Sequence, residues 1–336
     1  MKKMFAALPQ KLFAAIPRIA ALVLAVFAFG ITPVQAQDWP NKPIRFIAPF
    51  PPGGSVDQVA RILANALSPA LGQPIIVDNR GGAAGSIGTS IAAKAAPDGY
   101  TFVVVFDTHA VNPSLIPSMG FDTQKDLQPV MLIATAPMAL VTNAATPYKS
   151  IADVIAVAKA QPGTIGYGTI GSGSLGHLAM TLAQVQRGFQ VTHVPYKGGG
   201  PLMQDAIAGH VPLAIGTTFL VSPHIESKLV RPLAVTSSKR TARLPDVPTM
   251  AESGFVGFDV SAWWGILAPA NTPKPIVDRM LAELAKVLQQ PAVRDKLTQQ
   301  GMDIVGGGPD VLARFITVEV DRWAKIVRDN NIKAGE

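Results

Sequence analysis

The stretch PIRFIAPFPPGGSVDQVARILANAL, Pro43 to Leu67, contains the pattern that predicts the fold of this chain. Its first part, Pro43–Phe50, is a short apolar run rich in strand formers, and a loop of prolines and glycines follows at once. After Ser55 the apolar side chains recur at helical spacing and fall on one face, at Val56, Val59, Ala60, Leu63 and Leu67. The stretch therefore predicts a strand, a loop and an amphipathic helix.

The same unit repeats along the chain. A strand at Ile75–Asn79 leads into a glycine-rich loop, a helix at Thr89–Ala96 and a further strand at Tyr100–Phe106. After the extended apolar stretch Ala134–Thr146, a second series begins with the helix Ile151–Ala160, which a capping box opens. Such alternation is typical of βαβ units and predicts the α/β class, with mainly parallel sheets flanked by helices.

Two series of this kind predict two lobes with a ligand cleft between them. We expect lobe 1 to comprise residues 37–137 together with 262–336, since two or three C-terminal helices return to the first series. Lobe 2 would then comprise residues 138–261, and the apolar stretch Ala134–Thr146 at this boundary would pass between the lobes. A mature length of about 300 residues fits two units better than one.

The N-terminus has the pattern of a secretory signal peptide, which we assign to residues 1–36. Basic residues precede the apolar run Ile19–Ile31, and Val34-Gln35-Ala36 is typical of a cleavage site. A membrane anchor needs about 20 apolar residues, and this run is shorter. We therefore expect cleavage after Ala36 and a location in the periplasm or at the cell exterior.

Composition argues against several classes of function. Removing the four leader cations lowers the formal net charge from +7 to +3. The remaining Lys and Arg form no clustered stripe, so we expect no nucleic-acid partner. The chain has no cysteine, which excludes disulfides and thiolate sites. No two histidines have the i, i+4 spacing of a helical metal pair, so we expect no metal.

Three loops follow one scheme, in which a strand ends, glycines and small hydroxyl residues follow, and a helix begins. They are PFPPGGSVD at Pro49–Asp57, NRGGAAGSIG at Asn79–Gly88 and GTIGSGSLGH at Gly168–His177. Glycines let backbone N–H groups approach a ligand, and a helix N-terminus attracts anions. Because such loops gather at the carboxyl ends of strands, two lobes that each supply them would face an anion across the cleft.

Two enzymatic hypotheses remain as alternatives. The third loop contains Gly171, Gly173 and Gly176 in the G-x-G-x-x-G spacing of dinucleotide-binding proteins. That site needs an acidic residue about 20 positions further on, whereas Leu178–Met203 contains no Asp or Glu. An exported α/β hydrolase would use Ser86 of AGSIG as its nucleophile, but a nucleophile elbow needs a sharp strand-to-helix turn, and Ser86 lies in a long loop.

Seven stretches, taken in order, resemble the signature blocks of the Bug-type solute-binding proteins, which are the extracytoplasmic receptors of tripartite tricarboxylate transporters. Together they extend over essentially the whole mature chain. They are WPNKPIRFIAPFPPGGSVDQVAR, VDNRGGAAGSIGTSIAAKAAPDGYTFVV, THAVNPSL, GTIGSGSLGHLAM, VPYKGGGPLMQDAIAGHV, LAVTSSKRTARLPDVPTMAESG and WWGILAPANTPKPIV.

The resemblance implies a two-lobed periplasmic-binding-protein fold of the second structural class, which closes by hinge motion around a small organic carboxylate. It implies a non-enzymatic receptor without a cofactor. The expected partners are the membrane subunits of a tripartite tricarboxylate transporter, or a sensor domain, and we expect a monomer.

The resemblance also implies which residues contact the solute. In lobe 1 these are Phe50, Gly53, Gly54, Ser55, Ala84, Gly85, Ser86 and Thr108. In lobe 2 they are Thr169, Ser172, Gly173, Ser174, His177, Tyr196, Thr217 and Phe219.

Two positions depart from the family pattern. Asp107 precedes Thr108 where the family usually has a small or hydroxyl residue. An acid there would repel a ligand carboxylate unless it points away from the cleft. In the turn Gly216–Phe219, threonines stand where many relatives carry Asp or Asn. The solute class therefore stays open among dicarboxylates, aromatic carboxylates and similar metabolites.

Overall fold

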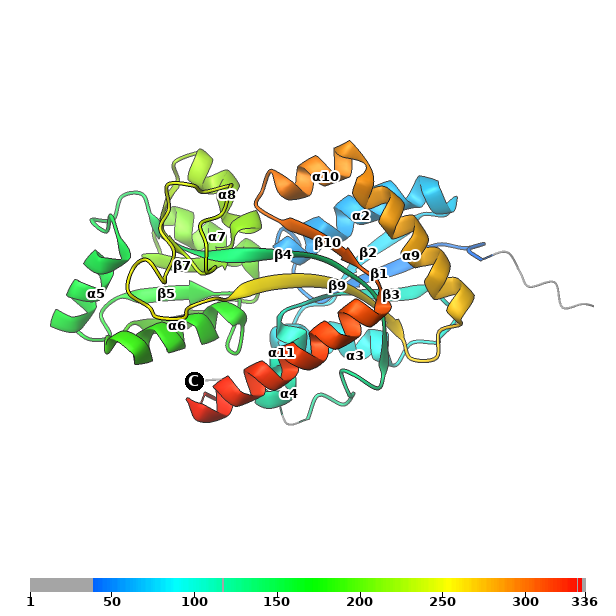
Figure 1. The fold of residues 1–336 in the computed structure, drawn as a ribbon, viewed down its shortest axis with the longest axis horizontal. Helices are drawn as coiled ribbons and strands as arrows, with labels where there is room; N and C mark the ends of the chain where they lie inside the picture. Colours follow the sequence, from blue (N-terminus) through cyan, green and yellow to red (C-terminus); the bar gives the residue numbers. More distant parts are fainter. Residues whose placement is uncertain (1–38, 117, 331, 334–336) are drawn as a thin grey trace, which may run out of the picture. The chain divides into compact units, whose positions relative to one another are not determined.

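The computed structural model describes residues 39–116, 118–330 and 332–333, so the predicted signal peptide and its cleavage site lie outside the described residues. In the described part, strands and helices alternate along the chain (Figure 1). The first series consists of β1 (Ile44–Ala48), α2 (Ser55–Leu71), β2 (Ile75–Asn79), the short 3-10 helix η1 (Ala83–Gly85), α3 (Ser86–Ala93), β3 (Thr101–Phe106) and α4 (Thr108–Leu115).

Strand β1 pairs in parallel with β2 on one side and with β3 on the other, as the alternation predicts. Helix α2 packs on these strands. Its predicted apolar face is buried in full, at Val56, Val59, Ala60, Leu63 and Leu67. Burial of a Val or Leu side chain stabilises the native state by about 1.5–3 kcal/mol, so this face holds the helix on the sheet.

The second series forms its own group of strands. It consists of α5 (Ile151–Ala160), β5 (Gly166–Thr169), α6 (Leu175–Arg187), β6 (Thr192–Pro195), α7 (Gly199–Ala208), β7 (Leu213–Thr217), α8 (Thr218–Glu226) and β8 (Val230–Val235). Strand β5 pairs in parallel with β6 and with β7. Helix α5 begins at the predicted capping box, in which Ser150 and Asp153 exchange hydrogen bonds.

The two groups of strands are joined by β4 (Leu127–Asn143), which changes partners along its length. As far as Pro137 it pairs antiparallel with β9 (Ser261–Pro269). From Met138 it pairs antiparallel with β7, and from Ala139 with β8. Thr236 adds a second link there, because its hydroxyl accepts from the Met138 N–H at 2.9 Å. The fold is therefore two-lobed, with parallel pairs in the outer strands and antiparallel pairs where the chain crosses. The lobe boundaries 37–137 with 262–336 and 138–261 stay a prediction.

After β9 the chain returns to the first group of strands. The elements are α9 (Lys274–Gln289), α10 (Pro291–Thr298), β10 (Asp303–Gly307) and α11 (Pro309–Asp329). Helix α9 packs on α2, β10 pairs with β4, and α11 packs on α4 and β4. Trp263 and Trp264 of β9 are fully buried, against Phe315 and Phe106 respectively. No helix among the described residues has the length and apolar character that a membrane span requires.

Candidate functional site

Two adjoining cavities lie where loops of both lobes meet. The larger has a volume of about 380 Å³ and the smaller one of about 20 Å³, and Phe50 and Ile170 line both. The other residues of the larger cavity are Gly82, Ala83, Ala84, Gly85, Asn112, Leu115 and Ile116 from lobe 1, and Gly171, Ser172, Tyr196 and Lys197 from lobe 2. Each lobe thus supplies one wall.

The larger cavity combines an apolar lining with a few polar groups. Phe50, Leu115, Ile116 and Ile170 supply the apolar part, whereas Asn112, Ser172 and Tyr196 supply hydrogen-bonding groups. Lys197, which is exposed, is the single charged side chain among the described residues that line this cavity. Small-molecule sites have this character, and 380 Å³ is near the lower end of their usual range of about 300–1,000 Å³, so a small anion fits.

The lobe 1 wall is formed by an unusual loop, Gly82–Gly85. Its four residues all have positive φ, at 130°, 46°, 50° and 86°, although the middle two are alanines. An L-residue in this region costs free energy and persists where the surrounding structure holds it. Here the Asn112 side chain donates to the Ala84 carbonyl at 3.0 Å, so α4 supports the loop. The loop runs directly into the N-terminus of α3, which favours an anion.

The lobe 2 wall is formed by the loop after β5, and several predicted contact residues support it from within. The Thr169 hydroxyl lies 2.7 Å from His193 Nε2 and also bonds the Gly171 backbone. His177 Nδ1 accepts from the Gly173 N–H at 3.1 Å. Its ring stacks on His193 with centroids 4.1 Å apart. Burial lowers the pKa of His177, which favours the neutral ring that this hydrogen bond requires.

The two lobes also touch directly. The loop Pro51–Gly54 after β1 meets the three glycines Gly198–Gly200 that open α7. A Cβ atom on Gly200 would lie only 2.9 Å from the Pro52 carbonyl oxygen, and one on Gly54 would lie 3.5 Å from the Gly199 nitrogen. Backbone therefore packs against backbone, and the absence of a side chain at Gly200 is what allows this approach.

The structure places eight of the sixteen predicted contact residues in the linings of the two cavities: Phe50, Gly54, Ser55, Ala84, Gly85, Ser172, Tyr196 and Thr217. The other eight do not line either cavity: Gly53, Ser86, Thr108, Thr169, Gly173, Ser174, His177 and Phe219. Of these, Gly173 lies next to the lining, since its Cβ position faces the side chain of Leu115 at 2.6 Å.

Most of these eight residues have another contact. Ser174 caps α6 by accepting from the His177 N–H, and Gly53 donates its N–H to Asp57. Phe219 is fully buried and packs near Trp264. Asp107 also lines neither cavity: it is fully buried, and burial raises the pKa of its carboxyl group well above the ordinary value.

The cavities also include residues that the sequence analysis did not name as contacts, above all Asn112, Leu115, Ile170, Lys197 and Gly199. A signal for part of this set was present in the sequence. Lys197 directly precedes three glycines and a helix, which is the scheme of the other three glycine loops. Nothing in the local pattern marks Leu115 or Ile170, because their position depends on how the two lobes meet.

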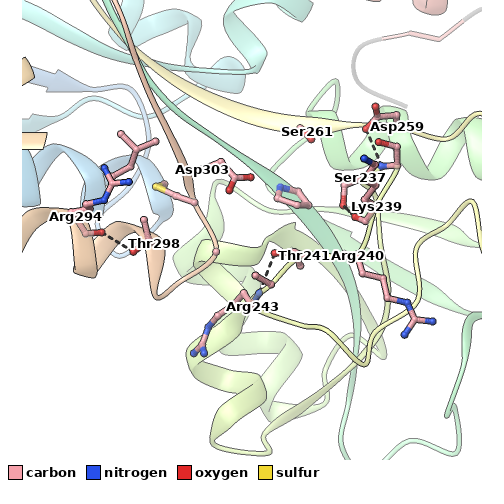
Figure 2. A pocket seen from close by; sticks show the side chains of 16 residues that line it. Ser237, Lys239, Arg240, Thr241, Arg243, Asp259, Ser261, Arg294, Thr298 and Asp303 are labelled. Atoms are coloured by element: carbon pink, nitrogen blue, oxygen red, sulfur yellow. Dashed lines mark hydrogen bonds between the residues drawn. The ribbon is translucent and has the colours of Figure 1, made fainter. Parts of the chain in front are cut away.

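A third crevice, of about 580 Å³, has a different character (Figure 2). Residues 237–243 of lobe 2 line one part of it, and α10 with β10 lines another. Arg240 pairs with Glu252 at 2.9 Å, and Arg243 pairs with Glu226. The other charged side chains in its lining are of both signs, with Lys239 and Arg294 beside the carboxylates of Asp259 and Asp303. None of the three glycine loops lines this crevice, whereas these loops line the two cavities, which are therefore the candidate site.

Comparison with known proteins identifies the family. The sequence pattern described as "Tripartite tricarboxylate transporter family receptor" matches residues 59–332. Protein BugT of Bordetella pertussis (strain Tohama I) is 39% identical over 318 residues, which cover 94% of this chain and 98% of that protein.

Solved structures show the same fold. The periplasmic binding protein BugD has a TM-score of 0.85 at 33% identity, covering 88% of this chain and 100% of that one. Rpa4515 of R. palustris with adipate has a TM-score of 0.85 at 36% identity, covering 89% and 100%. MatC (Rpa3494) from Rhodopseudomonas palustris with bound malate has a TM-score of 0.81 at 30% identity, covering 86% and 100%.

The family pattern extends over most of the chain, and the relatives match over nearly their full length. The chain therefore belongs to the tripartite tricarboxylate transporter receptors, the Bug-type solute-binding proteins with the two-lobed fold of periplasmic binding proteins.

Proposed function

We propose that this receptor captures a small aliphatic dicarboxylate in the larger cavity between its lobes. The observation that carries the proposal is the lining of that cavity, in which apolar side chains adjoin glycine loops, hydroxyl groups and one lysine. An aliphatic chain matches the apolar part, and carboxylates match the backbone and side-chain donors. The similar proteins with adipate and with malate are consistent with this class of solute.

Capture would close the lobes because both supply contacts to the same solute. We propose that Phe50, Ala84, Gly85 and Asn112 contact it from lobe 1, and that Ser172, Tyr196 and Lys197 contact it from lobe 2. A ligand shifts a conformational equilibrium only by its difference in affinity for the two states. Only the closed form presents both walls to the solute, so it binds the solute more tightly than the open form. This difference in affinity shifts the population toward the closed form.

The eight predicted residues outside the linings would act on solute indirectly or not at all. We propose that Thr169, Ser174 and His177 hold the loop after β5 in the shape that places Ser172 at the cavity.

The cellular role follows from the family. We propose a periplasmic monomer, exported by the signal peptide, that is non-enzymatic, needs no cofactor and delivers solute to the membrane subunits of a transporter or signals through a sensor domain. The family members include periplasmic binding proteins.

The first experiment is isothermal titration and thermal unfolding of the mature protein with adipate and malate. Hexanoate serves as the matched control, since it keeps the chain of adipate and lacks one carboxylate. A ligand at a hundredfold excess over its Kd stabilises the native state by about 2.7 kcal/mol. Binding of dicarboxylates and not of hexanoate supports the proposal. A response to NAD, or turnover of an ester, without dicarboxylate binding would replace it with one of the enzymatic hypotheses.

A further inference from the structure

A carboxyl group outside the cavities is the most unusual polar side chain in the described structure. Asp107 lies between β3 and α4 and is completely buried. Both of its carboxylate oxygens are buried and lack a hydrogen-bond partner. An ionised carboxylate in such surroundings is strongly unfavourable, and the group keeps its proton instead.

Lobe 2 supplies part of the cover over this side chain. Two backbone N–H groups lie near the carboxyl group of Asp107, those of Thr108 in α4 and of Leu175, the first residue of α6 in lobe 2. Neither N–H group forms a hydrogen bond of regular geometry with the carboxyl oxygens. The lobes also meet close by, because Gly173, just before α6, packs against Leu115 of α4. We infer that separating the lobes would move Leu175 away and open this side of the carboxyl group to water.

The other titratable groups around Asp107 do not compensate its charge. Glu319 on α11 is acidic and raises the pKa of Asp107 further. Glu319 itself is held by the Trp323 ring N–H at 2.8 Å and by Arg322 at 3.5 Å. On α4, burial lowers the pKa of His109 to about 4, so this histidine is neutral at pH 7. On α6, the lowered pKa of His177 favours its neutral form.

We propose that Asp107 is a proton-binding site coupled to solute capture, so that closing the lobes around a solute at neutral pH takes up a proton. The open form exposes the carboxyl group and lets it ionise, whereas the closed form holds it protonated. This inference rests on the proposed function, because a solute must close the lobes. It adds a second ligand, the proton, which the family assignment does not include.

The sign of the pH dependence follows from linkage. Between the pKa of the open form and that of the closed form, closing binds up to one proton, so the solute affinity falls as pH rises, by up to tenfold per pH unit. Below the open-form pKa both forms are protonated and the dependence disappears. The solute does not supply the proton, since simple dicarboxylates are ionised at neutral pH as free Asp and Glu are.

The test is titration of adipate at pH 6, 7 and 8 in two buffers that differ in ionisation enthalpy, which gives the number of protons taken up. We expect uptake between zero and one in the natural protein, with weaker binding at higher pH. In Asp107→Asn we expect no uptake and an affinity that does not change with pH. Asp303→Asn, an exposed acid on β10, is the matched control and should keep the uptake.

Two results would overturn the inference. Adipate binding without proton uptake in the natural protein removes it and leaves the proposed function intact. If no dicarboxylate binds, the proposed function fails, and carbon NMR of the Asp107 carboxyl group in a disulfide-closed variant decides about the proton site. Titration of that carboxyl group in the ordinary Asp range in the closed variant would then refute the inference.

Discussion

The contact between Gly200 and the loop after β1 gives the sharpest test of closure. In Gly200→Ala the new methyl group would lie 2.9 Å from the Pro52 carbonyl oxygen and within 4 Å of the Gly53 backbone. All three nearest atoms belong to the other lobe, so lobe 2 by itself has room for the change. Gly200 is also the second residue of α7, and its φ is not in the left-handed region.

Two effects of opposite sign follow. Alanine favours a helix over glycine by up to about 1 kcal/mol, so the unliganded protein should keep or gain stability. The closed form must instead relieve a contact with backbone, and overpacking of this kind costs about 1–3 kcal/mol. Since about 1.4 kcal/mol corresponds to a tenfold change in Kd, adipate should bind roughly 5- to 150-fold more weakly.

The assay is isothermal titration with adipate beside urea unfolding of the unliganded protein. Gly308→Ala is the matched control: Gly308 precedes α11, its φ is negative, and its nearest neighbour would lie at 3.8 Å. We expect it to bind as the natural protein does. Unchanged adipate affinity in Gly200→Ala would show that solute binding does not require the lobes to approach as closely as they do here. Loss of stability in the unliganded variant would show that the clash lies within lobe 2.

Three further predictions concern the walls of the larger cavity. Lys197→Met should weaken adipate binding by a few fold, since an exposed charge contributes about 0.2–1 kcal/mol. Titrations at two salt concentrations should show that binding to this variant depends less on salt than binding to the natural protein. An equal salt dependence would place Lys197 outside the site. Asn112→Ala removes the 3.0 Å hydrogen bond to the Ala84 carbonyl. It should destabilise the protein by about 0.5–1.5 kcal/mol in urea unfolding and weaken adipate binding. Normal binding would mean that the loop Gly82–Gly85 keeps its shape without Asn112. The pKa of His177 lies below the ordinary value of 6.5, so the unfolded chain binds a proton more readily than the native state. The natural protein should therefore lose stability as pH falls from 7.5 to 5.5, by up to about 1.4 kcal/mol for each unit by which the pKa is lowered. The loss should be smaller in His177→Gln, and an equal loss in both proteins would refute this.

Much of the fold could be predicted because it depends on local patterns. The apolar face of α2 and the capping box of α5 were predicted from local patterns, and both are present. Two or three C-terminal helices were predicted, and the structure contains three, α9, α10 and α11. Strand β10 was not predicted, since its sequence Asp303–Gly307 is short and glycine-rich and its strand form depends on pairing with β4. The change of partners along β4 is likewise a long-range event, which no local periodicity encodes.

The site divides in the same way. By itself the sequence determined the α/β class and the glycine loops at the ends of strands, because strand period, helix period and glycine content act over a few neighbouring residues. Its family resemblance implied the two-lobed fold. Only the tertiary structure decided which residues of those loops line the cavities, because that depends on contacts between segments far apart in the chain. It placed Ser172 at the larger cavity while Thr169 and His177 support the loop behind it, and it enclosed Asp107 away from both cavities.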